Sequence, residues 1–184
     1  MKPTEILMNE HRVIERALKI LNIMIEKIEA EESINLDMLE RLLDFIQTFA
    51  DKCHHGKEEK ILFPTFEKYG LPKEGGPIGV MLMEHEIGRK YVKMMMVFSK
   101  LKFGDKPQIK IFIENGKGYV QLLSQHIMKE DNILFPMGEG LISNEVRIKL
   151  MKDFEDLEER EIGKGIHERY YHLIEGLERE LGIN

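Results

Sequence analysis

The chain has 184 residues, of which 33% are charged, and its formal net charge is −6. This length suits one domain with a sizeable core, and the acidic balance gives no reason to expect nucleic acid or an anionic membrane as a partner. The chain begins without a signal-like segment, and no apolar run approaches the roughly 18–20 residues of a membrane-spanning helix. A single cysteine, Cys53, excludes an internal disulfide and fits a reducing compartment, so we expect a cytoplasmic protein.

Long stretches with helical periodicity alternate with short turn signals along the chain. The turn signals fall at residues 31–35, 69–77, 103–107, 138–144 and 163–165. The helices expected between them span about 4–30, 36–66, 78–102, 107–136 and 145–181, the last broken near Gly163. Thr4 is expected to cap the first helix, Pro77 to start the third and Asn144 to cap the fifth.

Four long helices joined by short loops pack most simply as an up-down-up-down bundle. We therefore predict one all-α domain over residues 1–184, with a four-helix bundle at about 4–137. A C-terminal helical extension, at about 144–181, is expected to lie across the bundle with its charged residues mostly in solvent.

The two halves of the predicted bundle repeat one another. ILMNEH at 6–11 resembles VMLMEH at 80–85, and HHGKEEKILFP at 54–64 resembles QHIMKEDNILFP at 125–136. The aligned histidines are 74 residues apart in the first pair and 72 in the second. A duplicated helix pair gives the bundle a pseudo-two-fold axis, so residues near that axis should occur twice.

Each of the four bundle helices is expected to carry a histidine on its apolar stripe, and two of them carry a glutamate one turn later. These residues are His11, His54, Glu58, His85, His126 and Glu130. His55 and Glu59 fall on a polar row of the second helix and are expected to face water. Because a buried ionised glutamate is costly unless it is paired or bound to a metal, the six inward residues are predicted metal ligands.

An imidazole and a carboxylate at positions i and i+4 stack on one helix face and can converge on one site. A mixed set of this kind suits iron, manganese or zinc, whereas a thiolate site would need cysteines. Two carboxylates among four histidines suit two ions better than one, with each ion taking two imidazoles and both carboxylates as bridges. An additional oxo or hydroxo bridge would leave an open position on each ion for a small molecule.

The order H…HxxxE…H…HxxxE, with LFP after each HxxxE at 62–64 and 134–136, resembles the hemerythrin-like (HHE cation-binding) domain family. The resemblance covers about residues 4–137 and implies a four-helix bundle that holds two non-haem iron ions; zinc and manganese are the alternative metals. Members of that family include oxygen carriers, oxygen or redox sensors, an iron-sensing domain, and proteins that repair iron centres or handle nitric oxide and peroxide. The implied partner is thus a small diatomic ligand or a peroxide.

Two departures from the oxygen carriers guide the choice among these functions. The carriers have another histidine four residues after the third-helix histidine, where this chain has Arg89, expected to be a surface residue. The carriers also end in HxxxxD, and Asp131 does stand five residues after His126. The repeat aligns Glu130 with Glu58, so Glu130 is preferred as the ligand and Asp131 is kept as an alternative. With four histidines the set resembles the symmetric repair-type sites more than the carriers.

Several residues have alternative interpretations. His55 and Glu59 are kept as alternative ligands or ligand partners, and His167 is expected at the surface or beside a ligand, or else near the metals. Tyr119 is expected to be a core aromatic or, alternatively, to line the ligand pocket, and Gly88 leaves room for a ligand or for close helix packing. A ferritin-like site needs more inward acidic residues than the chain supplies. The other interpretations are a metal-dependent sensor that uses its C-terminal helix as a partner surface, and a bundle without metal.

Overall fold

A computed structural model describes residues 2–99 and 106–183, and every regular element in these ranges is helical. This confirms the predicted all-α class. The bundle begins with α1 (Pro3–Glu29), and its second long segment runs through α2 (Leu36–Phe45), η1 (Ile46–His55), η2 (Glu58–Leu62) and α3 (Phe63–Lys68). The other bundle elements are α4 (Pro77–Ser99), α5 (Lys106–Lys129), η3 (Glu130–Leu134) and α6 (Phe135–Glu139), and the C-terminal pair is α7 (Asn144–Glu161) and α8 (Ile166–Leu181).

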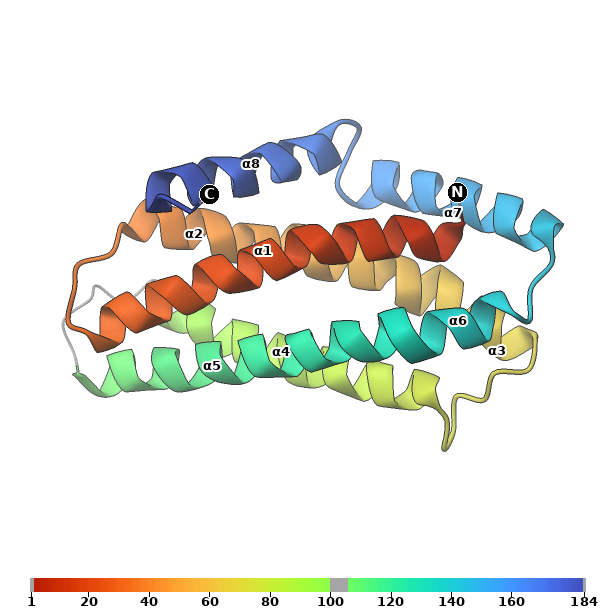
Figure 1. Ribbon diagram of the computed structural model, residues 1–184, viewed down its shortest axis with the longest axis horizontal. Helices are drawn as coiled ribbons and strands as arrows, with labels where there is room; N and C mark the ends of the chain where they lie inside the picture. Colours follow the sequence, from red (N-terminus) through yellow and green to blue (C-terminus); the bar gives the residue numbers. More distant parts are fainter. Residues whose placement is uncertain (1, 100–105, 184) are drawn as a thin grey trace.

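The four long segments lie side by side around a common core (Figure 1). The first segment, α1, packs against α2 and α5, while α4 packs against α5 and α2. The extension does not lie across the bundle as expected: α7 and α8 follow one another lengthwise along the side formed by α1 and the second segment (Figure 1). The physical reason is that Leu150, Phe154, Leu157, Ile174 and Leu177 form an apolar stripe on the two helices, which is buried on that side.

The helix starts partly agree with the sequence signals. Pro77 begins α4 as expected. Thr4 does not cap α1, because the helix already begins at Pro3; its hydroxyl instead donates to Glu139 at 2.9 Å and ties α1 to α6. The cap of α7 is Ser143 rather than Asn144, since the Ser143 hydroxyl accepts a hydrogen bond from the backbone N–H of Val146. The expected turn at 103–107 and the end of the third expected helix fall largely outside the described residues.

Three stretches of the bundle are π-helical: η1, η2 and η3. A π-helix bonds each amide to the carbonyl five residues earlier, so it has more residues per turn than an α-helix. Successive side chains therefore diverge less in direction than an α-helical pattern assumes. Both predicted HxxxE motifs overlap these π-helical stretches, so the directions of their side chains depart from those of an α-helix.

The core consists of two apolar clusters with the histidine-bearing layer between them. One cluster, which includes Leu21, Phe45 and Phe112, fills one end of the bundle. The other, which includes Phe66, Phe154 and the Leu-Phe pairs of both LFP motifs, fills the opposite end. Each fully buried leucine or phenylalanine contributes about 1.5–3 kcal/mol. No helix in the described part of the chain is long and apolar enough to cross a membrane.

Two glycines allow a matched test of this packing. A Cβ on Gly138 of α6 would lie 2.1 Å from the Phe66 ring, whereas nothing lies within 4 Å of one on Gly176 of α8. We expect Gly138→Ala to destabilise the protein by about 1–3 kcal/mol through overpacking. Gly176→Ala should be neutral or stabilise it by up to about 1 kcal/mol, because alanine favours the helix. Urea unfolding of both variants under one metal condition measures the difference, and equal stabilities would contradict the close approach of α6 to α3.

Candidate metal centre

The structure brings all six predicted ligands into one buried layer. Their side chains are at most 1% exposed. Two groups of donor atoms, each within 4.8 Å of one another, are formed by His11, His54, Glu58 and Glu130, and by His55, Glu58, His85 and His126. The two groups share Glu58, as two neighbouring cation positions with a common carboxylate would require.

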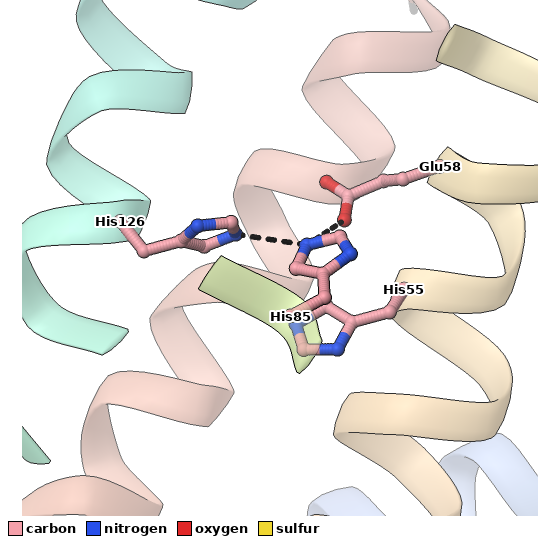
Figure 2. Close-up of side chains that lie close together, drawn as sticks. All are labelled: His55, Glu58, His85 and His126. Atoms are coloured by element: carbon pink, nitrogen blue, oxygen red, sulfur yellow. Dashed lines mark hydrogen bonds and ion pairs between the residues drawn. The ribbon is translucent and has the colours of Figure 1, made fainter. Parts of the chain in front are cut away.

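His55 does not face water, so that prediction is wrong. The side chain is buried, and its ring stacks on the His85 ring with centroids 3.8 Å apart and planes 16° apart (Figure 2). The α-helical periodicity used for the sequence fails here because η1 is a π-helix that ends at His55. The wider turn directs both His54 and His55 inward, and the layer holds five histidines rather than four.

Every one of the five rings has a carboxylate partner for its Nδ1 atom. The donor–acceptor pairs are His11–Asp131 (2.6 Å), His54–Glu10 (2.8 Å), His55–Asp51 (3.3 Å), His85–Glu59 (2.7 Å) and His126–Glu84 (3.0 Å). Since a carboxylate only accepts, Nδ1–H donates and the neutral ring keeps an unprotonated Nε2. Such carboxylate partners orient metal-binding histidines and increase their basicity.

The structure thus places Asp131 and Glu59 beside ligands rather than in the donor groups, and it adds three acidic partners that sequence analysis missed. Glu10 and Glu84 each stand directly before a histidine of the repeat, so the two EH pairs were a usable signal. Asp51 has no counterpart in the second half and carries no such signal.

A basic side chain accompanies most of these carboxylates. Lys57 and Lys129, equivalent in the repeat, bond to Glu10 and Glu84. Arg89 is not a free surface residue: its guanidinium is 2.8 Å from Asp51 and 2.7 Å from Glu59. Arg89 therefore binds the carboxylate partners of the stacked His55 and His85 rings. It occupies the position where the oxygen carriers have another histidine.

The two central carboxylates have no hydrogen-bond partner among the described residues. All four oxygens of Glu58 and Glu130, and Nε2 of His11, are buried and unsatisfied. The Nε2 atoms lie 3.2 Å from Glu130 in His11 and His126, and 3.5 and 3.4 Å from Glu58 in His54 and His85, outside hydrogen-bonding geometry. Because buried carboxylates without partners are costly, the donor set fits bound cations.

The spacing of two ring nitrogens also suits a metal. Nε2 of His85 and Nε2 of His126 are 3.0 Å apart and point toward one another (Figure 2). Two donors each about 2.1 Å from an ion, at a right angle, are separated by roughly 3 Å. The same position is flanked by Glu58, which is 3.4 Å from His85.

The surroundings shift the pKa values of the rings and of the central carboxylates in different directions. Burial lowers the pKa of His54 and His55 to about 4 and that of His85 to about 3, so these rings are neutral near pH 7. Burial acts the same way on His126, but the charges of Glu130 and Glu84 raise its pKa to about 9. Burial and the facing Glu130 charge raise the pKa of Glu58, a penalty that a cation between the two would remove.

A cavity of about 310 Å³ approaches the layer from the side of η1 and α4. Its lining includes His55, Gly88, Arg89, Val92 and Tyr119. Tyr119 was expected either in the core or at a ligand pocket, and it is both buried and part of this lining. Because His55 also belongs to the second donor group, a small molecule in the cavity would lie against that group.

His167 lies near the centre but not in either donor group. Its Nε2 donates to Glu10 at 3.1 Å, and Glu10 in turn accepts from His54. His167 was expected at the surface, beside a ligand or near the metals, and it lies one carboxylate farther out than a residue beside a ligand, because Glu10 stands between it and His54.

A helical bundle with a buried layer of histidines and carboxylates is typical of helical metal-binding proteins. Within that class, the model of the hemerythrin HHE cation binding domain matches residues 2–138, and the chain belongs to this family. The chain is similar to the uncharacterized protein Mb2018 of Mycobacterium bovis and to the uncharacterized proteins MT2051 and Rv1995 of Mycobacterium tuberculosis. Each is 25% identical over 180 residues, which cover 97% of this chain and 70% of the relative. No solved structure matches the chain.

Metal should stabilise the protein strongly because it satisfies the unpartnered oxygens. At a free metal concentration about 100 times Kd, binding to the native state alone adds about 2.7 kcal/mol. Thermal unfolding with and without Fe(II) or Zn(II), checked by elemental analysis, measures this.

The His55→Ala variant should be stabilised less by metal and should bind one tight ion fewer. The His172→Ala variant, which changes an exposed ring, should match the parent protein. Equal metal content in both variants would remove His55 from the ligand set.

Proposed function

We propose that this chain is a non-haem di-iron protein whose centre binds, senses or reacts with a small ligand: oxygen, peroxide or nitric oxide. The observation that carries the proposal is the set of four unpartnered carboxylate oxygens of Glu58 and Glu130 enclosed by five imidazoles. Mixed imidazole and carboxylate donors suit iron, and zinc and manganese use similar sets. Family membership supports a cation site at these positions.

The donor groups suggest which residues hold each ion. His11 and His54 would hold the first ion, and His55, His85 and His126 the second, with Glu58 and Glu130 between them. Iron at these positions would supply redox chemistry and open positions for a small ligand. The protein would orient the rings through their Nδ1 partners, keep the layer dry and admit the ligand.

The inequality of the two ions revises the comparison with four-histidine repair-type sites. That comparison counted four histidines, with Arg89 where the carriers have another. The buried His55 adds a fifth ring, so two imidazoles lie on one side and three on the other. Reversible oxygen binding, disfavoured on the sequence alone, is therefore an equal candidate with stress-related chemistry on nitric oxide or peroxide.

The deciding experiment is anaerobic reconstitution with Fe(II) followed by exposure to each ligand in turn. We expect about two iron ions per chain, as the two donor groups imply. Oxygen, hydrogen peroxide or nitric oxide should then produce new visible absorption, and reversal under vacuum separates carriage from reaction. Zinc-loaded protein is the control that should stay colourless. Fewer than about one iron per chain, with no new absorption, would reject the proposal.

The cavity beside His55 gives a separate test of ligand entry. A Cβ on Gly88 would lie 3.6 Å from the Tyr119 ring, which is ordinary contact, so a larger side chain must extend into the cavity. We expect Gly88→Leu to slow azide and nitric oxide binding about 10-fold while iron content stays the same. The leucine side chain would narrow the path, and misalignment of a reacting molecule alone can lower a rate by this much. Stopped-flow absorbance measures the rates.

Gly88→Ala keeps most of the cavity open and is the matched control. Its binding rates should stay close to those of the parent protein. If Gly88→Leu binds both ligands at the parental rate with full iron content, ligands reach the centre by another route.

A second candidate function, a metal-dependent sensor, has one specific observation in its favour. Glu158 and His167, both on the C-terminal pair of helices, are linked by hydrogen bonds to the environment of His54. Metal occupancy would in that case alter how α7 and α8 dock.

A further inference from the structure

A charged cluster with a buried Glu10–Lys57 pair lies on the far side of His54 from the metal layer. Its members are Glu10, Lys57, Glu158 and His167. The Lys57 ammonium is 2.5 Å from Glu10 and 2.9 Å from Glu158, and its side chain is 1% exposed. Glu10 also accepts from His54 at 2.8 Å and from His167 at 3.1 Å, so three donors meet on one carboxylate.

The donor atoms of Glu10, Glu158 and His167 are close enough to one another to suggest a third metal site. The Lys57 ammonium, however, bonds to both carboxylates of this group, and burial does not neutralise it, because Glu10 raises the pKa of Lys57. A metal ion there would face the fixed positive charge of Lys57 at close range. The cluster therefore pairs one ammonium with two carboxylates, and among the described residues it reaches the centre through the hydrogen bond from His54 to Glu10.

In the corresponding network of the second half of the repeat, the lysine is partly exposed rather than buried. Lys129 bonds to Glu84, which accepts from His126, but the Lys129 side chain is 29% exposed. The difference comes from the extension, because α7 packs against η1, η2 and α1, and α8 against α1 and α2. The matched family domain ends at residue 138, so Glu158 and His167 are additions to it.

Each helix of the extension contributes one contact to the network. Glu158 belongs to the last turn of α7, and His167 to the first turn of α8. The turn between them contains Gly163 and Gly165, whose φ values of 93° and 75° suit glycine. This turn lets both side chains reach Lys57 and Glu10 from adjoining helices.

We propose that Glu158 and His167 are positioning residues for the metal centre, acting through Lys57 and Glu10 on His54. The extension thereby fixes the imidazole of the first ion, and binding of that ion and docking of α7 and α8 strengthen each other. Coupling of this kind is reciprocal by thermodynamic necessity. The inference rests on the proposed metal function and specifies how its first ion would be regulated.

The test compares two double variants with matched chemistry. Glu158→Gln with His167→Gln removes both contacts. Glu161→Gln with His172→Gln is the control, since Glu161 pairs with the partly exposed Lys60 and His172 is an exposed ring on the same helix as His167. Competition titrations with a chromophoric chelator give the two Zn(II) affinities of each protein.

We expect the first double variant to bind one of its two ions about 10-fold more weakly, in the range found when partners of metal-binding histidines are removed, and the other ion unchanged. Mössbauer spectra of the iron-loaded protein should change in one iron signal only. Hydrogen exchange should show that metal protects residues 144–181 in the parent and control proteins, and much less in the first double variant.

The possible failures are distinguishable. If the parent protein binds no metal, the proposed function and this inference both fail. If the parent binds two ions and the first double variant matches it in both affinities, the di-metal function stands and the positioning role is wrong. Equal weakening of both ions, together with a lower unfolding temperature of the metal-free protein, would show a purely structural effect and would also overturn the inference. Each single variant, with circular dichroism as a folding check, repeats the comparison at smaller perturbation.

Discussion

The structure depends on two carboxylates that face each other inside an apolar bundle. Glu58 and Glu130 are fully buried, and no hydrogen bond from the described residues reaches their oxygens. Two such charges in a low-dielectric interior cost several kcal/mol each unless cations compensate them. The apolar clusters at either end of the bundle supply stabilisation that opposes this cost.

The surrounding residues form successive layers of different chemistry. Imidazole rings enclose the carboxylates, acidic side chains accept the outer ring N–H groups, and lysines or arginines pair with those acids. Arg89 serves two rings at once, because its one guanidinium bonds to the carboxylate partners of both His55 and His85. Bidentate geometry makes arginine suited to such a role, and a lysine at that position would hold one partner at most.

Much of this arrangement follows from the sequence, because the repeat and the helical periodicity identify the helices that carry the ligands. The residues His11, His54, Glu58, His85, His126 and Glu130 were all expected to face inward, and all are buried. The periodicity failed at His55, where backbone bonding changes from α to π and the direction of a side chain no longer follows from its spacing. The network around Lys57 was also beyond sequence analysis, since it joins residues 10, 57, 158 and 167 through tertiary packing alone.

The departures from internal symmetry are the most informative features of the molecule. A perfect duplication would give two equivalent donor groups, yet His55 has Ile127 as its counterpart, and the buried Lys57 has the partly exposed Lys129. The side of the first donor group is therefore covered by the extension, while the second donor group has an extra imidazole and a cavity beside it. If ligands enter at the second ion and the extension responds to the first, chemistry and regulation occupy opposite sides of one centre. Glu58, which both donor groups share, would then be the physical link between them, because any change in charge at one ion alters the field that the other experiences.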